Sequence, residues 1–303
     1  MTVFYYDWTT PGAPVFDNTT TLTEVLAQIL FAAGWTIPFG TTNKRAFVSA
    51  APGPQNFYRF EYNGSGTAST ETALIACESM PDIDHVSNPW CGNLPSSPLR
   101  TPGMTPTVAA RAWFTVVDQF TCTFCVETSP GSNQYYWLHF GDYWDYRARA
   151  RRSIVWATTE GGHGPYIAGS VAEANDTSAF VRINRNWDNQ LATRATIVSD
   201  TALCTSGAFA GALPYPDVIS GKTYLPAMFV CDPAAGRVLG KIRGQRLFAH
   251  AIDGVSMGQV IPGDDEDTGK SFKIIKPLID VNSSGGPRGV ACFETSDTWL
   301  TNV

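Results

Sequence analysis

The sequence predicts a mainly β fold of the α+β class, in which antiparallel sheets form a sandwich-like arrangement and one N-terminal helix packs on a sheet. The chain of 303 residues contains 27 Gly and 20 Pro, a share of turn-forming residues that excludes a helix bundle or a coiled coil. It also contains 17 Phe, 11 Tyr and 9 Trp, which favour strands and supply enough apolar surface for a folded core. A convincing helical pattern occurs in one segment.

That helix is predicted over residues 21–33. Thr21 and Glu24 have the spacing of a capping box, in which each residue bonds the backbone of the other. Gly34 follows the apolar run, at a position where helices often end in a left-handed residue. The apolar side chains that recur at helical spacing are Leu22, Val25, Leu26, Ile29 and Leu30. We expect this helix to cover one face or one end of a sheet.

Most of the remaining chain is predicted as strands. Ala112–Val126 is expected to form one long strand, with Asp118 interrupting its apolar face at a bulge, and a Pro-Gly turn leads from it into the strand 135–140. An Asn-Gly turn predicts a second hairpin between 57–62 and 70–77. Shorter strands are predicted at 153–158, 179–183, 195–199, 223–231, 238–242 and 289–294.

Aromatic side chains mark the expected core and the expected turns around these strands. The Phe-Gly-Asp segment at 140–142 is predicted to close a hairpin and to orient Tyr143 and Trp144. The aromatic residues that we expect in the core are Trp113, Phe114, Phe120 and Phe124.

The chain divides weakly into two β-rich parts, 1–150 and 151–303, because an Arg-rich stretch precedes a Gly-rich loop near this position; a single domain is the alternative. The segment 81–106 contains six prolines and is too long for an ordinary connection. We expect it, together with the loop 262–269, to reach neighbouring subunits or solvent.

Charge and cysteine usage exclude several classes of protein. The net charge is −6 and charged residues make up 16% of the chain, so a general nucleic-acid binder is excluded. No apolar run is long enough to cross a bilayer, and the first residues lack the features of a secretory signal. Seven cysteines, an odd number, predict free and mostly buried thiols made in a reducing cytoplasm. Cys122 and Cys125 would point to opposite faces of a strand, which argues against a zinc site.

No catalytic, cofactor-binding or metal-binding residue is assigned. The chain has no nucleophile elbow, phosphate-binding loop, zinc-protease motif or dinucleotide fingerprint, although a pair of distant carboxylates of the glycosidase kind stays open. The run Asp264–Asp267 lacks the alternating ligands of a calcium loop and is expected to be a solvated acidic loop. Structural roles are also expected for the four histidines, His85, His139, His163 and His250.

Several segments follow one another in an order that carries a resemblance. Tyr6–Asn18 leads into the predicted helix and Trp35, and Phe57–Tyr62 follows, with later segments at Met80–Asp84, Arg111–Phe114 and Gly236–Gly244. In this order, which covers most of the chain, the sequence resembles a family of virion structural proteins of tailed bacteriophages.

The resemblance implies a β-rich particle component without enzyme activity, located in the virion and assembled in the host cytoplasm. Its partners would be other virion proteins and copies of itself, in a symmetric homo-oligomer such as a ring or a trimer. The expected place is the tail tip or baseplate. Alternatives are a capsid decoration or cement protein and, from another class, a glycan-binding or glycoside-hydrolysing virion module.

The low charge fits a protein that presents aromatic surface to its neighbours, because interface cores are depleted in charge and enriched in aromatic residues and Arg. Exposed rings would also be needed to stack on the faces of sugars. The candidate interaction residues are Trp137, Tyr143, Trp144 and Trp187.

Overall fold

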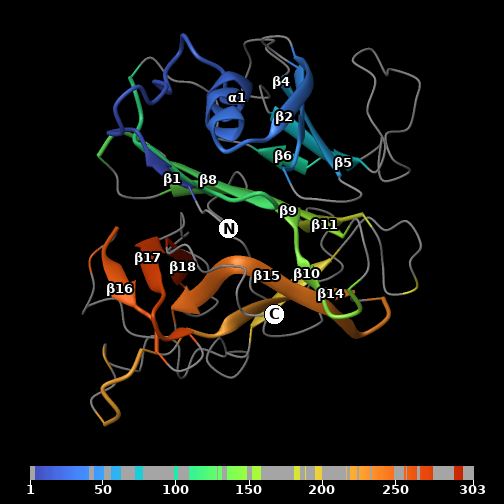
Figure 1. Cartoon of the computed structure of the whole chain (residues 1–303), viewed down its shortest axis with the longest axis vertical. Helices are drawn as coiled ribbons and strands as arrows, with labels where there is room; N and C mark the ends of the chain where they lie inside the picture. Colours follow the sequence, from blue (N-terminus) through green and yellow to red (C-terminus); the bar gives the residue numbers. More distant parts are fainter. Residues whose placement is uncertain are drawn as a thin grey trace.

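The chain folds into three antiparallel sheets and one helix, as the computed structural model shows (Figure 1). This confirms the predicted mainly β class. The residues that the structure describes, and to which every statement below refers, are 4–40, 44–50, 56–62, 72–77, 99–101, 109–127, 129–131, 135–148, 152–157, 181–184, 188, 195–199, 216, 219–223, 225–232, 234–248, 256, 258–264, 267–275 and 290–295.

The sheets are stacked in layers. The N-terminal sheet has the strand order β2 (Thr36–Gly40), β3 (Lys44–Val48), β4 (Phe57–Tyr62), β5 (Thr72–Cys77) and β6 (Leu99–Thr101). The central sheet has the order β1 (Phe4–Asp7), β7 (Trp113–Val117), β8 (Thr121–Glu127), β9 (Tyr135–Asp142), β11 (Ser153–Ala157) and β12 (Val181–Ile183). The C-terminal sheet has the order β13 (Thr196–Ser199), β14 (Ala227–Asp232), β15 (Arg237–Phe248), β18 (Val290–Glu294), β17 (Ser271–Ile275) and β16 (Val260–Pro262), and β10 (Trp144–Asp145) pairs with β15.

The helix α1 (Leu22–Ala32) has the predicted start and end. Thr21 Oγ1 accepts a hydrogen bond from Glu24 N at 3.3 Å, and Thr21 N donates to Glu24 Oε2 at 2.8 Å. At the other end Gly34 has a φ of +84°. There Gly34 N donates to the Phe31 carbonyl oxygen and Trp35 N to that of Leu30, the bond pair of a Schellman motif. The capping box and the left-handed glycine are therefore confirmed.

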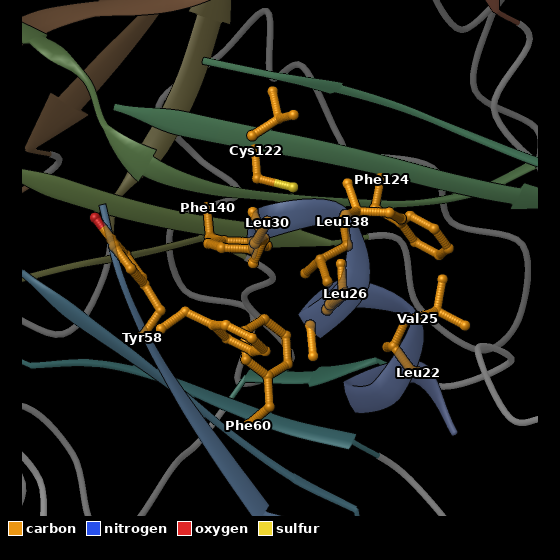
Figure 2. Close-up of a cluster of buried hydrophobic side chains, with 14 of the residues drawn as sticks. Leu22, Val25, Leu26, Leu30, Tyr58, Phe60, Cys122, Phe124, Leu138 and Phe140 are labelled. Atoms are coloured by element: carbon orange, nitrogen blue, oxygen red, sulfur yellow. The ribbon is translucent and has the colours of Figure 1, made fainter. Parts of the chain in front are cut away.

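The helix and the N-terminal sheet together cover one face of the central sheet. Figure 2 shows side chains of α1 between rings of β4 and side chains of β8 and β9. Trp35 closes this core, because its ring lies 5.8 Å from that of Phe140 and its Nε1 donates to the Asp118 carbonyl oxygen at 2.7 Å. The labelled residues of the cluster are Leu22, Val25, Leu26, Leu30, Tyr58, Phe60, Cys122, Phe124, Leu138 and Phe140.

The C-terminal sheet covers the opposite face of the central sheet (Figure 1). Gln245 of β15 hydrogen-bonds Thr123 of β8 and His139 of β9, and Lys273 of β17 contacts the ring of Tyr5. Every residue of β7 and β8 is buried as a result. The predicted opposite orientation of Cys122 and Cys125 is consistent with this layering, since Cys122 belongs to the helix-side core and both thiols are buried and free.

The prediction of one long strand over 112–126 was wrong. The segment forms two strands, β7 and β8, that pair with each other across a tight turn. Asp118 makes this turn, because its Oδ1 accepts hydrogen bonds from Phe120 N at 2.7 Å and Thr121 N at 2.6 Å. Trp113, Phe114 and Phe124 are buried as expected. Phe120 lies in the turn and is only partly buried, which corrects its assignment to the core.

The segment 140–142 is not a turn, as was predicted, but the end of β9, which pairs with β8 on one side and β11 on the other. Gly141 has a φ of +145°. A Cβ at this position would overlap the Phe120 carbonyl oxygen, so the glycine permits a close approach of two backbones rather than a reversal of the chain.

The sheets do not divide at residue 150. β11 and β12 follow the predicted boundary in sequence but belong to the central sheet, together with strands that precede it. The predicted hairpin of 57–62 with 70–77 is confirmed by the pairing of β4 with β5. Part of the predicted loop 81–106, residues 99–101, is the edge strand β6, and most of the loop lies outside the described residues.

Substituting Gly141 tests the close approach of β9 to the β7–β8 turn. Gly141→Ala adds a methyl group that meets backbone atoms, and we expect it to destabilise the protein by about 3 kcal/mol. Gly131→Ala is the matched control, because Gly131 also has a positive φ, of +76°, but nothing lies within 4 Å of its Cβ position. The control should lose only about 1 kcal/mol. Urea denaturation measures both, and equal losses would contradict the close approach.

Candidate functional site

The strand β10 and the turn that follows it carry the candidate interaction surface. β10 leaves the central sheet after β9 and pairs with β15, so that Trp144 faces Lys241 and Asp145 faces Gly240. Tyr146 N then donates to the Leu239 carbonyl oxygen at 3.1 Å. Gly240 permits this approach, because a Cβ there would overlap the Trp144 carbonyl oxygen. Two sheets thus fix the position of β10.

Asp145 anchors the turn from inside. Its side chain is 2% exposed and forms an ion pair with Arg152, from Oδ2 to Nε at 3.2 Å, and Arg152 is 1% exposed. Asp145 Oδ1 also accepts a hydrogen bond from Arg147 N at 2.6 Å, and its carbonyl oxygen accepts one from Ala148 N at 2.9 Å. With Asp145 held inward, the residues Tyr146, Arg147 and Ala148 are exposed.

We call Trp144, Tyr146 and Arg147 the β10 surface. The rings of Trp144 and Tyr146 meet edge to face, with centroids 5.3 Å apart and an interplanar angle of 68°. Trp144 is half-buried and Tyr146 is 48% exposed. Trp, Tyr and Arg are the residue types that dominate the energetics of protein interfaces. Flat exposed rings also suit sugar faces.

Of the predicted interaction residues, Trp144 alone is shown at the surface. Tyr143 is 2% exposed and its N donates to the Arg152 carbonyl oxygen, so it supports the β10 turn from inside and the expectation of a surface role is corrected. Trp137 lies on β9 opposite Cys125, but its side chain is outside the described part of the structure, as is the whole of Trp187.

Tyr146 was not singled out from the sequence, since nothing in the aromatic run indicates which rings point outward. The described chain exposes other large apolar side chains as well, and they are spread over different elements. These are Trp8, Val15, Phe31, Ile219, Val238 and Val260. Tyr146 differs from them because its ring contacts that of a second candidate, Trp144.

His139 is an interior residue, as expected. It lies between the central and C-terminal sheets, where its Nδ1 is 2.8 Å from Thr123 Oγ1 and 2.7 Å from Gln245 Nε2. Burial lowers the pKa of His139 to about 3. The ring is therefore neutral at physiological pH and acts as a hydrogen-bonding link between two sheets.

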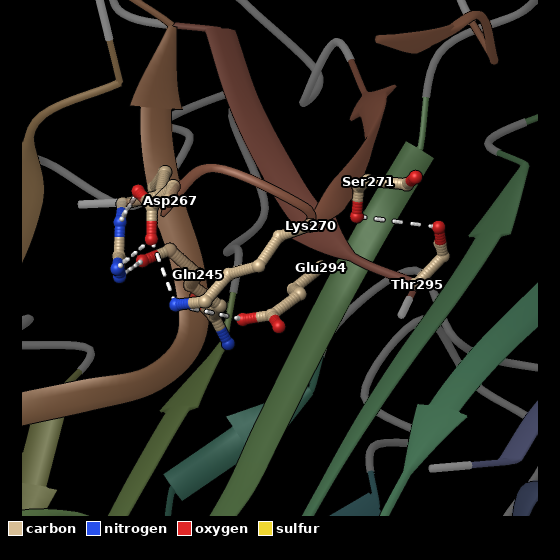
Figure 3. A network of polar contacts seen from close by, with 7 residues as sticks. Gln245, Asp267, Lys270, Ser271, Glu294 and Thr295 are labelled. Carbon is tan, nitrogen blue, oxygen red and sulfur yellow. Dashed lines mark hydrogen bonds and ion pairs between the residues drawn. The ribbon is translucent and has the colours of Figure 1, made fainter. Parts of the chain in front are cut away.

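The expectation of a solvated acidic loop at Asp264–Asp267 was wrong for the two residues that the structure describes. Asp264 is partly buried, and its Oδ2 accepts a hydrogen bond from Thr223 N at 2.6 Å. Asp267 is buried and receives a bidentate contact from Arg246, at 2.9 and 2.8 Å, and a third bond from Lys270 Nζ at 2.8 Å (Figure 3). Lys270 also lies 4.0 Å from Glu294.

This buried network ties the loop to β15 through Arg246 and to β18 through the contact of Lys270 with Glu294. Burial raises the pKa of Asp267, but hydrogen bonds and charges from Arg246 and Lys270 outweigh it, so the net pKa lies below the usual value. A Cβ at Gly263 would overlap the Asp267 carbonyl oxygen, so the loop folds back on itself and carries Asp267 inward. Two cationic side chains, Arg246 and Lys270, bind the carboxylate.

Among the described residues, no three His, Cys, Asp or Glu side chains come together in a way that could hold a metal ion. Three of the four histidines, His85, His163 and His250, lie outside the described residues.

Substituting Asp267 tests the network. Asp267→Asn leaves Arg246 and Lys270 buried without their carboxylate, so we expect a loss of about 3 kcal/mol at pH 7 by urea denaturation. Because the pKa of Asp267 is lowered on folding, its stabilisation is present above the unfolded value of about 4 and disappears as the pH falls through the folded value. The control Asp264→Asn keeps an oxygen for Thr223 N and should change stability by less than about 1 kcal/mol. Similar losses in both variants would contradict the assignment.

Comparison with known proteins adds no relative. No protein-family model matches the chain, and no curated protein matches it in sequence. Among the described residues, no helix is long and apolar enough to cross a membrane, and α1 has only 11 residues. The β10 surface and the layered fold are therefore the basis for the functional conclusion.

Proposed function

We propose that this protein is a non-enzymatic structural component of a tailed bacteriophage particle, placed at the tail tip or baseplate and acting through symmetric protein–protein assembly. The observation that carries the proposal is the β10 surface, in which an aromatic pair and an arginine project from a turn that a buried ion pair holds in place. The order of sequence segments described above supplies the resemblance to phage virion proteins.

The construction of the β10 turn favours binding of a protein partner. Association loses free energy when flexible side chains and loops must be ordered, by about 0.5–1.5 kcal/mol for each immobilised side chain. Asp145 and Arg152 fix the backbone of the turn before any partner binds. The ring of Tyr146 already rests against that of Trp144. A partner would therefore meet a surface that is largely preorganised.

The composition supports the same role. Charged residues make up 16% of the chain, whereas soluble domains average about 25%. When neighbours cover a surface with few charged groups, the free-energy cost of removing those groups from water is smaller. The proposed partners are copies of the chain and other virion proteins, and a capsid decoration or cement protein would use such a surface in the same way.

A glycan-binding virion module is the second candidate. The Trp144–Tyr146 pair favours it, because exposed aromatic rings can stack on sugar faces and one of these rings is 48% exposed. The two functions differ in the ligand that covers the rings, so one pair of variants tests both.

The test substitutes the two rings of the β10 surface. Trp144→Ala and Tyr146→Ala should each weaken self-association at least tenfold, measured by sedimentation over a concentration series, and should reduce incorporation into particles in a complementation assay. Phe31→Ala is the matched control, since Phe31 is 69% exposed on α1 in a different layer, and it should leave both readouts unchanged.

Two results would contradict the proposal. One is unchanged association and incorporation of both ring variants. The other is unchanged assembly combined with loss of binding to a carbohydrate array, which would establish the glycan-binding alternative.

A further inference from the structure

The loop that follows β1 exposes a second group of large apolar side chains. Trp8 N donates to the Trp113 carbonyl oxygen at 3.0 Å, and Arg111 N donates to that of Phe16 at 3.1 Å. The loop therefore leaves the central sheet and rejoins it at the same place, beside the start of β7. Two side chains stay at the surface near these anchors, because Trp8 is 57% and Val15 is 54% exposed.

Acidic side chains flank this loop. The sequence from residue 1 to residue 43 contains acidic residues but neither Lys nor Arg. Side-chain and backbone hydrogen bonds from Thr19 hold the pKa of Asp17 below its usual value, so Asp17 is ionised at neutral pH. The charge of Lys273 acts on Asp7, which leaves Asp17 as the main negative charge. We call these residues the N-terminal surface: Asp7, Trp8, Val15 and Asp17.

The region of the β10 surface has the opposite charge. Its cations are Arg147 and Arg237, which are exposed, and Lys241, which is half-buried. Of the residues described from 143 to 148 and from 227 to 241, the acidic ones are Asp145 and Asp232, and both are buried. An ion pair holds Asp145 inward, and two backbone hydrogen bonds from the β14–β15 turn hold Asp232. The cationic side chains therefore reach the surface, whereas the carboxylates do not.

The two surfaces lie at opposite corners of the central sheet. β1 is an edge strand, and β7 and β8 separate it from β9. The register across these strands places Asp7 level with Trp137, near the start of β9. β10 begins beyond Asp142, at the other end of β9. Figure 1 accordingly shows β1 and β10 on opposite sides of the molecule. The two surfaces of one copy face away from each other and are free to meet those of other copies.

We infer that the β10 surface of one copy binds the N-terminal surface of the next copy, head to tail. The cations beside Trp144 and Tyr146 then face Asp17, and the aromatic pair covers the exposed apolar side chains of the loop. This inference rests on the proposed function, because it identifies the partner of the β10 surface as another copy of this chain.

Charge complementarity favours this partner over a contact of the β10 surface with itself. A two-fold contact between two β10 surfaces would bring like charges together, which opposes association. The head-to-tail contact pairs opposite charges and covers exposed apolar side chains on both partners. Because it uses a different surface on each partner, one copy can bind two neighbours. Contacts of this kind generate a closed ring where the rotation between copies permits.

A mixture of two variants tests the head-to-tail geometry. Tyr146→Ala weakens the β10 surface and Trp8→Ala weakens the N-terminal surface, so each protein alone should lose association at least about tenfold. In an equimolar mixture the Trp8→Ala protein offers an intact β10 surface to the intact N-terminal surface of the Tyr146→Ala protein. Sedimentation should then show 1:1 dimers and no larger species. Phe31→Ala is the matched control for Trp8→Ala, because Phe31 is also an exposed ring, at 69%.

A charge exchange tests the complementarity. Arg147→Glu keeps the backbone N that donates to Asp145, and at low salt it should weaken self-association at least about tenfold. Adding Val15→Lys to the same chain places a cation beside Asp17 and should restore association. The control adds Ile219→Lys instead, which gives the same net charge at a residue that is 92% exposed in another part of the chain, and it should restore nothing.

Two results would overturn the head-to-tail contact and leave the proposed function standing. One is a mixture that stays monomeric although Tyr146→Ala alone has lost association. The other is equal restoration by Val15→Lys and Ile219→Lys. A wild-type protein that stays monomeric at every concentration would also overturn it, and incorporation of the ring variants into particles would then decide the proposed function separately.

Discussion

The structure depends on the burial of both faces of the central sheet. α1 and the N-terminal sheet cover one face with apolar side chains, and the C-terminal sheet covers the other. Because both faces of this sheet are covered, its buried polar side chains need hydrogen-bond partners within the protein. Thr123, His139 and Gln245 meet this need between two sheets.

Elements with local signals were predictable from the sequence. The capping box of Thr21 and Glu24 and the left-handed Gly34 act within one turn of α1, so the helix was predicted almost to the residue. The hairpin of β4 and β5 follows from alternation around a turn sequence. The break between β7 and β8 was missed, because apolar residues continue on both sides of Asp118 and Gln119 and so resemble a single strand. Asp118 makes the turn by accepting backbone hydrogen bonds.

The candidate site was less predictable, because the pairing of strands that are distant in sequence determines it. Which ring of the run 143–146 points outward depends on Gly240 and Leu239 of β15, to which β10 is bound. The prediction of a solvated loop at Asp264–Asp267 was wrong for the same reason, because Arg246 reaches Asp267 only when β15 and the loop come together. The low charge and the aromatic content predicted surfaces that bind other proteins, but they did not indicate which residues form these surfaces.

The central claim is that the β10 surface is covered by protein in an assembled particle. A cryo-EM map of purified particles that contain this chain, at a resolution that shows side chains, tests it most directly. The account predicts that Trp144 and Tyr146 lie against a neighbouring subunit, in every symmetry-related copy. A map in which both rings face solvent or a bound carbohydrate would contradict it.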